Sequence, residues 1–158
     1  MAEEQKQRVL NYLGAHSTMV LSTIGPAGLW ATPVFYVNRG FNLYFLSEST
    51  TRHSVNIMQG SEAAAAITGE HWDWRSIQGL QVRGQAGIVE GTGVKAKALA
   101  LYCTKFPAVS QIFASPKGFK GVSAAKWHVL QIKNLRFTDN TVHFGERFEI
   151  DLTSWEEA

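Results

Sequence analysis

Residues 42–57 read NLYFLSESTTRHSVNI, and this stretch decides how the chain is organised. Apolar and polar side chains alternate over residues 41–46, which predicts a β-strand. A run of hydroxyl and basic side chains follows directly, and residues 51–58 then have the spacing of a short helix. The chain therefore passes from a strand through a polar turn into the N-terminus of a helix.

The polar turn carries three kinds of group that hold phosphate. Hydroxyls and a guanidinium donate hydrogen bonds, and the first turn of a helix offers free backbone N–H groups. The candidate ligands are Ser47, Thr50, Thr51, Arg52 and His53. Acidic residues are usual in a first helical turn because the helix dipole is positive there, so a neighbouring anion better explains Arg52. The segment predicts a site for a phosphorylated ligand.

These candidates also have ordinary structural interpretations. Thr50 or Thr51 could serve only as the helix N-cap, a role that stabilises a helix by about 1 kcal/mol. His53 could cap the helix, bind the ligand or face water, and a histidine is often uncharged near neutral pH. Both interpretations are kept open for the hydroxyls and for the histidine.

The rest of the chain has the pattern of a mainly β protein with some helix. Strands are predicted at 18–23, 29–37, 41–46, 63–68, 77–90, 126–132 with 134–138, and 141–150. Helices are predicted at 3–14, 51–58 and 94–114, with a second helical piece starting at Pro107. About six or seven short strands separated by Gly-rich turns are typical of a closed or partly closed antiparallel barrel.

The composition indicates one ordinary globular domain over residues 1–158. Hydrophobic residues make up 45% of the chain and charged residues 18%, and the formal net charge is +2. We see no basic stripe and expect no nucleic-acid partner. The single Cys103 excludes an intramolecular disulfide and fits a reducing compartment. No signal peptide or apolar run of ~20 residues is present, so we expect a cytoplasmic protein with no membrane span.

The common catalytic and metal-binding motifs are missing from the sequence. The five histidines are scattered without the spacing of a metal site, and we predict none. Neither the G-x-S-x-G elbow of hydrolases nor a Gly-rich nucleotide loop occurs. Cys103 lies in a predicted helix, and we interpret it as a small buried apolar residue rather than a catalytic thiol.

The order of these motifs resembles that of the pyridoxamine 5′-phosphate oxidase-like FMN-binding split barrels. The shared features are an N-terminal helix, G-P-x-G at 25–28, ATPVFY at 31–36, LYFLS at 43–47 and S-T-T-R-H at 49–53. The C-terminal KNLRFTDNTVHFGERFEIDL at 133–152 resembles an uncharacterised bacterial subgroup of that superfamily. The resemblance covers nearly the whole chain. It implies an α+β fold, a six- to seven-stranded antiparallel split β-barrel.

The resemblance also implies a cofactor and an assembly. Members are homodimers that hold two FMN molecules at the subunit interface. In this chain the 47–53 segment would hold the phosphate, the 31–34 backbone would meet the polar edge of the flavin, and strand 79–83 would flank the ring. The residues mapped onto the FMN site are Ala31, Thr32, Pro33, Val34, Ser47, Thr50, Thr51, Arg52, His53 and Gln81. Where the oxidases typically have Arg-Lys, this chain has Arg52-His53, and histidine is the weaker phosphate anchor.

The expected function is that of a flavoprotein oxidoreductase that passes hydride or electrons between small molecules through FMN. The cofactor supplies the redox chemistry, so we name no catalytic residue. The residues with which the oxidases hold a second phosphate are not matched here, and oxidation of vitamin B6 is not expected. The alternatives are a non-catalytic flavin or haem carrier or sensor on the same fold, or a pocket that takes a deazaflavin.

Overall fold

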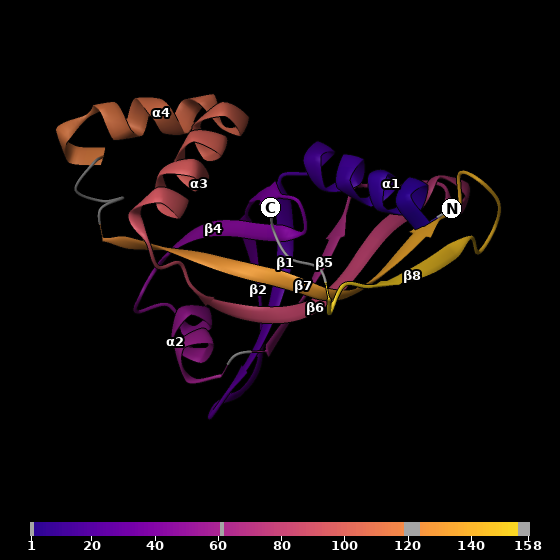
Figure 1. Cartoon of the computed structure of the whole chain (residues 1–158), viewed down its shortest axis with the longest axis horizontal. Helices are drawn as coiled ribbons and strands as arrows, with labels where there is room; N and C mark the ends of the chain where they lie inside the picture. Colours follow the sequence, from indigo (N-terminus) through magenta and orange to yellow (C-terminus); the bar gives the residue numbers. More distant parts are fainter. Residues whose placement is uncertain (1, 61, 119–123, 155–158) are drawn as a thin grey trace.

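Figure 1 shows the computed structural model, which describes residues 2–60, 62–118 and 124–154. The strands are β1 (Thr18–Gly25), β2 (Gly28–Phe35), β3 (Val37–Arg39), β4 (Asn42–Glu48), β5 (Glu62–Thr68), β6 (Gln78–Ile88), β7 (Ala125–Asp139) and β8 (Arg147–Asp151). The helices are α1 (Ala2–Ala15), α2 (Arg52–Gln59), α3 (Thr92–Lys105) and α4 (Pro107–Ala114), with one 3₁₀ turn at Trp74–Ser76. No helix in the described ranges is long and apolar enough to cross a lipid bilayer.

The strands form one antiparallel sheet in the order β2-β1-β5-β6-β7-β4-β3, and β8 pairs with β7. Strands β2 and β3 follow one another in the chain but lie at the two ends of this order. The sheet therefore curls until its edges meet at Tyr36, the single residue between those two strands. The two edge strands, β2 and β3, are joined by the chain at Tyr36 and do not pair with each other. This arrangement confirms the predicted split barrel.

The described sheet has eight strands, one more than the upper predicted count. The predicted strand 29–37 is divided at Tyr36 because its two parts pair with different neighbours, β1 and β4. The last strand begins at Arg147 and not at 141, because residues after Asp139 form a turn in which the Asp139 carboxylate accepts a hydrogen bond from the Thr141 backbone N–H. The structure confirms the predicted helices, whose ends lie within about two residues of the predicted ones.

A β-bulge lies in the long ladder between β6 and β7. Arg83 pairs with Asn134 and Gly84 pairs with Ile132, so Lys133 is the extra residue of the bulge. Gly84 is buried here, and a Cβ atom at this position would overlap with the Gln131 carbonyl. Bulges increase the local twist of a strand pair, which helps a sheet to curl.

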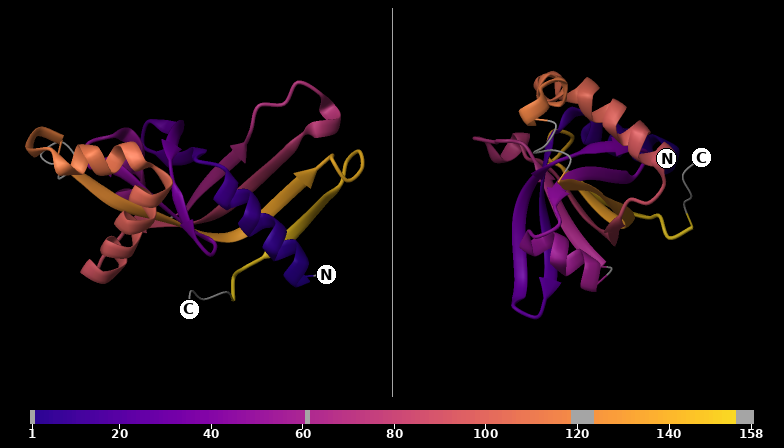
Figure 2. Two further views of the ribbon diagram at one scale, coloured as in Figure 1. Left: turned by 90° about the horizontal axis from the view of Figure 1, so that it is seen from above. Right: turned by 90° about the vertical axis from the view of Figure 1, so that its left-hand side faces the viewer.

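Alternate strand residues fill the interior of the barrel. In β1, Met19 and Leu21 are buried, whereas Val20 between them faces outward and is exposed. Helices α1 and α2 lie on the inner side, since Leu13 of α1 and Ile57 of α2 belong to the same buried cluster as the strand residues. Figure 2 shows α2 on one side of the β1–β2 ladder.

Helices α3 and α4 cover the outer side of the sheet at one end only. A second buried cluster joins α3 to the outer side of β3 and β4; it comprises Val37, Tyr44, Val89, Ala98 and Tyr102. Figure 1 shows this helix pair standing at the end of the sheet remote from β8. Within the described part of the chain, the outer side of β1, β2 and β5 therefore has no helix over it except at the end of β2, where Phe35 packs on Phe106 at the α3–α4 junction.

The bulge gives a direct test of the sheet. We expect Gly84→Ala to lower the free energy of unfolding by about 1–3 kcal/mol, because the added methyl meets backbone atoms that cannot move away freely. Gly87→Ala, in the same strand, is the matched control, since nothing lies within 4 Å of the Cβ it would add. Urea unfolding followed by circular dichroism measures both variants. Equal stabilities of the two variants would contradict the bulge.

Candidate functional site

The turn between β4 and α2 brings three of the predicted ligands together. The Ser47 hydroxyl lies 2.6 Å from Nε2 of His53 and 3.1 Å from the Thr51 hydroxyl, and the Thr51 hydroxyl lies 3.3 Å from the same Nε2. The Thr51 backbone N–H donates to the Glu48 carbonyl at 3.1 Å, which closes the turn. Thr50 lies at the exposed tip of that turn. The segment therefore places two hydroxyls and an imidazole at the start of α2.

A second pair of side chains continues this cluster into the core. Thr51 lies 3.0 Å from the Ser54 hydroxyl, which lies 3.0 Å from Nε2 of His128. Nδ1 of His128 donates to the Lys126 carbonyl at 2.8 Å, because a carbonyl can only accept. In the neutral ring Nε2 then accepts from Ser54. We call Ser47, Thr51, His53, Ser54 and His128 the hydroxyl–imidazole cluster.

Both histidines of the cluster are buried in the barrel. Burial lowers the pKa of His53 below its usual 6.5. Burial also lowers the pKa of His128; the hydrogen bond to the Lys126 carbonyl opposes this shift, and the nearby His53 and Lys126 add to it. His128 stacks on Phe45 with ring centres 5.1 Å apart. Both rings are therefore neutral at physiological pH, and the cluster acts through hydrogen bonds and not through fixed charge.

Arg52 begins α2 and turns toward the β1–β2 hairpin. Its Nη2 donates to the Ala27 carbonyl at 2.7 Å, and its Cζ lies 4.3 Å from the ring centre of Trp30. Its Nε is buried and has no hydrogen-bond partner. A cation–π contact and one strong hydrogen bond thus hold the guanidinium, while one buried donor is left over.

Strand β2 divides the predicted flavin contacts between two faces. Thr32 and Val34 lie on the same face as Trp30, toward α2, and Val34 packs against the core. Ala31 and Pro33 alternate with them and face outward. The Thr32 hydroxyl is buried without a partner, like Nε of Arg52. As β2 is the edge strand, half of its backbone polar groups are free of β1.

Gln81 is not part of this constellation within one chain. It lies on the outer face of β6, where it pairs with Ala66 of β5 and Arg136 of β7. Ser47 pairs with Lys126 of β7, which is on the order of 30 Å along the strand from Arg136. A shallow hollow of about 250 Å³ lies beside Gln81 on that outer face. Its role at a flavin stays a prediction.

Three contributors to the site escaped the sequence interpretation. Ser54 could have been found, because it lies three residues after Thr51 and so shares its helix face. His128 has no local signal, since it comes from a strand 74 residues further along the chain. Trp30 has no local signal either, since its contact with Arg52 joins β2 to the start of α2. In the described ranges, no three His, Cys, Asp or Glu side chains group as a metal site would require.

Comparison with known sequences finds UPF0306 proteins as relatives. No model of a known protein family matches the chain. A UPF0306 protein of Photorhabdus laumondii is 29% identical over 148 residues, which are 92% of this chain and 95% of that protein. A UPF0306 protein of Serratia proteamaculans is 27% identical over 146 residues, covering 91% of this chain and 93% of that protein.

Comparison with solved structures decides the fold. A protein from Listeria innocua, described as a pyridoxamine 5′-phosphate oxidase, superposes with a TM-score of 0.64 at 15% identity over 84% of this chain and 97% of its own. The fold is that of the pyridoxamine 5′-phosphate oxidase-like split barrels. HutZ, a haem storage protein from Vibrio cholerae, has a TM-score of 0.66 at 12% identity, with 92% and 93% of the two chains covered. A haem-binding protein from Mycobacterium smegmatis has a TM-score of 0.70 at 19% identity, with 91% of this chain and 57% of that one covered.

The buried imidazole of His128 predicts a pH dependence of stability. Its folded pKa lies below the 6.5 of the unfolded chain, so on acidification the unfolded chain binds the proton first. The stability present above about pH 6.5 is therefore lost progressively as the pH falls below that value. We expect the free energy of unfolding of the wild type to fall between pH 7 and pH 5, and His128→Gln to be less stable at pH 7 but flatter over this range.

Urea titrations at several pH values measure this dependence. Gln111→Ala serves as the control, because Gln111 is exposed and carries no titratable group. The control should keep the wild-type slope. Parallel pH profiles for His128→Gln and the wild type would show that His128 is not the titrating group.

Proposed function

We propose that this split barrel binds FMN and works as a flavoprotein oxidoreductase. The observation that carries the proposal concerns unsatisfied polar atoms. Within the described residues, two buried side-chain polar atoms lack a hydrogen-bond partner, Thr32 Oγ1 and Arg52 Nε. Buried polar groups are rarely left unpaired because each costs about 1–3 kcal/mol. Both atoms belong to residues that the resemblance assigns to the cofactor, and a bound ligand would satisfy them.

The start of α2 fits a phosphate group. The Thr51 side chain makes no capping hydrogen bond to α2. The first backbone N–H groups of this helix can therefore donate to an anion. The Ser47 hydroxyl lies at that end as a donor, and Nε of Arg52 supplies a charged donor. The Thr51 hydroxyl donates to the Glu48 carbonyl at 2.8 Å, so its proton is not available to a phosphate. A dianionic phosphomonoester matches this donor set better than a neutral ligand does.

The free edge of β2 fits the polar rim of a flavin. An isoalloxazine ring presents acceptors and one N–H along its pyrimidine edge, and the unpaired N–H and C=O groups of an edge strand can meet them. We assign this contact to the backbone between Ala31 and Val34. Gln81 would belong to a different wall of the site.

A homodimer is part of the proposal. The outer side of β1 and β2 exposes Val20, Ile24, Leu29 and Phe35. Surface of this kind is typical of a subunit interface, and it lies beside the edge strand that would hold the ring. Two copies joined here would enclose the cofactor between them.

The chain's own residues bind and orient in this reaction. FMN supplies hydride or electron transfer when it is bound. The protein would fix the phosphate at α2, align the ring on β2 and limit the access of water from the partner side. Small molecules act as electron donor and acceptor, and we assign no acid or base to the chain.

Haem binding is the second candidate, since the two haem-associated proteins described above share the fold. A haem needs one axial ligand and an apolar slot. Both ring nitrogens of His128 are already hydrogen-bonded inside the barrel, so an axial histidine would have to come from elsewhere. This observation ranks haem below FMN.

Arg52 and riboflavin together test the phosphate site. We expect Arg52→Ala to raise the dissociation constant for FMN by about ten-fold or more, because a hydrogen bond to a charged group contributes about 1.5–3 kcal/mol. Riboflavin lacks the phosphate, so its affinity should not change. Flavin fluorescence titration of purified protein measures both ligands.

Arg147→Ala, which removes an exposed arginine of β8, is the matched control and should bind FMN like the wild type. If Arg52→Ala lost the binding of both FMN and riboflavin, Arg52 would contribute to the fold or to the contact with the ring, and not to the phosphate site.

A wild type that binds no flavin but develops a sharp Soret band with haemin would make haem the first candidate. Reduction of bound flavin by NADH or NADPH, followed by reoxidation, separates an enzyme from a carrier.

A further inference from the structure

Four exposed apolar side chains gather at the end of the sheet opposite α3 and α4. Trp72 is 95% exposed and Phe144 75%, and Trp74 and Val142 are more than half exposed. They come from two loops, β5–β6 and β7–β8, which Figure 2 shows side by side. We call Trp72, Trp74, Val142 and Phe144 the aromatic tip. A folded chain seldom leaves such side chains in water unless they meet a partner.

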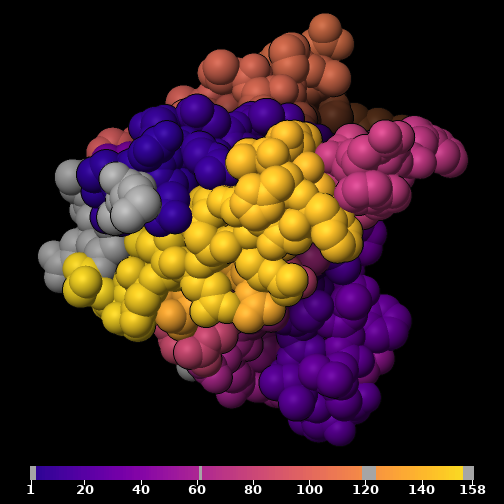
Figure 3. Space-filling model, turned by 90° about the vertical axis from the view of Figure 1, so that its right-hand side faces the viewer, coloured from indigo at the N-terminus to yellow at the C-terminus, as the bar shows by residue number. Residues whose placement is uncertain are grey.

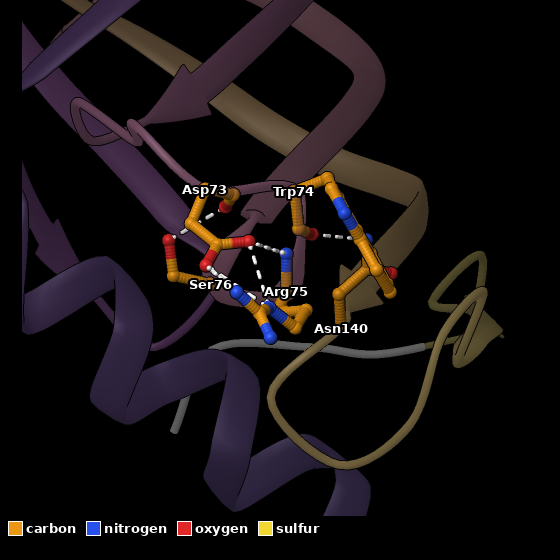
Figure 4. Close-up of polar contacts among 5 residues, drawn as sticks. All are labelled: Asp73, Trp74, Arg75, Ser76 and Asn140. Atoms are coloured by element: carbon orange, nitrogen blue, oxygen red, sulfur yellow. Dashed lines mark hydrogen bonds and ion pairs between the residues drawn. The ribbon is translucent and has the colours of Figure 1, made fainter.

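Hydrogen bonds hold the aromatic tip in one shape. Asn140 donates from Nδ2 to the Trp74 carbonyl at 2.8 Å, which ties the two loops together (Figure 4). Asp73 accepts from the Arg75 backbone N–H at 2.9 Å and from its guanidinium, and this contact fixes the 3₁₀ turn. Trp74 and Phe144 pack edge to face with ring centres 5.0 Å apart. The tip is a preformed surface, so a partner need not order it on binding.

The polar side chains around the aromatic tip have partners within the same two loops. Arg75 lies 2.7 Å from Asp73, and His143 lies 2.6 Å from Glu146. No excess positive charge is left among these residues to attract nucleic acid or an anionic membrane. The chemistry therefore favours an apolar protein surface.

The chain carries a matching surface on the same side of the molecule. The outer face of β1 and β2 is apolar. The neighbouring strand β5 presents the small side chains of Ala64 and Ala66 on this face. A hollow of about 260 Å³ opens in this face; it is lined by Ser22, Thr23, Ile24, Leu29, Glu62, Ala63, Ala64 and Arg83. Figure 3 shows the β5–β6 loop and the β1–β2 region projecting on one side, with the surface between them set back.

Neither surface is large enough alone for a stable interface. An aromatic side chain buries about 150–250 Å² when fully covered, so the three aromatic residues of the tip offer roughly 350–550 Å². A standard interface needs about 800 Å² from each partner. The outer face of β1–β2 adds four more exposed apolar side chains, Val20, Ile24, Leu29 and Phe35. A two-fold dimer would cover both at once, because each copy supplies one of each.

We propose that Trp72 of one copy inserts into the hollow between Ile24, Leu29 and Ala64 of a second copy, and that this contact clasps the dimer. The hollow lies at the hairpin end of the strands and the tip at the other end. An antiparallel face-to-face arrangement therefore brings them together in both directions. A tryptophan that is exposed in the free subunit and enters a desolvated pocket of the partner is a common anchor of protein interfaces. The inference deepens the homodimer of the proposed function and adds an aromatic wall from the partner beside β2.

Sedimentation velocity over a dilution series tests the clasp. We expect Trp72→Ser to raise the dimer dissociation constant by about ten-fold or more. Leu29→Ser, on the rim of the hollow, should weaken the dimer too, and the double variant should be less than additive, because both side chains belong to one contact. Ile112→Ser on α4 is the matched control, since Ile112 is 47% exposed and lies outside both surfaces. It should dimerise like the wild type.

Circular dichroism checks that each variant is folded, which we expect since Trp72 and Leu29 are exposed. A wild type that stays monomeric at all concentrations overturns the proposal. So does a Trp72→Ser dimer as tight as the wild type, a fully additive double variant, or an Ile112→Ser dimer weakened as much as Trp72→Ser. FMN titration of the same samples is read separately: a Trp72-dependent dimer without flavin binding sinks the flavin proposal and leaves the clasp, and the reverse result leaves FMN and sinks the clasp.

Discussion

Tyr36 is the residue at which the chain leaves one edge of the sheet and joins the other. It is completely buried, its backbone N–H donates to the Ser17 carbonyl, and its hydroxyl donates to the Leu13 carbonyl at the end of α1. The Lys105 amine at the end of α3 lies 4.5 Å from its ring centre and also donates to the His16 carbonyl. Burial lowers the pKa of Lys105 to about 8, so this amine is still mostly charged at neutral pH. One tyrosine thus joins both ends of the sheet to two helices.

The geometry of the proposed site depends on this junction. Because the chain turns away at Tyr36, β2 has a strand on one side only, and its other edge is left for a ligand. Because β3 and β4 lie on the far side of the split, α3 and α4 cover the outer face there and not over β1 and β2. The uncovered apolar face and the free strand edge are therefore two results of the same curl.

Local signals in the sequence predicted the elements well. Alternation located β4 and β6, Pro107 marked the start of α4, and the hydroxyl–basic run marked the start of α2. The pairing of distant strands could not be predicted in this way. The β4–β7 ladder joins Ser47 to Lys126, and no periodicity within either strand specifies that neighbour.

The candidate site divides along the same line between local and distant contacts. Ser47, Thr51 and His53 meet because they lie within seven consecutive residues. The contact of Arg52 with Trp30 and the contact of Ser54 with His128 both depend on the curl of the sheet. Likewise, the four residues mapped along β2 face two ways, because a strand alternates and one phosphate-ring ligand cannot meet all four side chains.

The histidine at position 53 changes how a phosphate would be held. Where a lysine would bring a fixed charge, the buried His53 is neutral and works through its hydrogen bond to Ser47. If Nε2 is protonated, it donates to the Ser47 hydroxyl, and the Ser47 proton can be donated to an anion. If Nε2 is unprotonated, the Ser47 hydroxyl donates to the ring and turns a lone pair toward the ligand. A phosphate therefore selects the first arrangement. The site would bind an anion by choosing a direction of hydrogen bonding within the hydroxyl–imidazole cluster, and Arg52 would add a permanent charge.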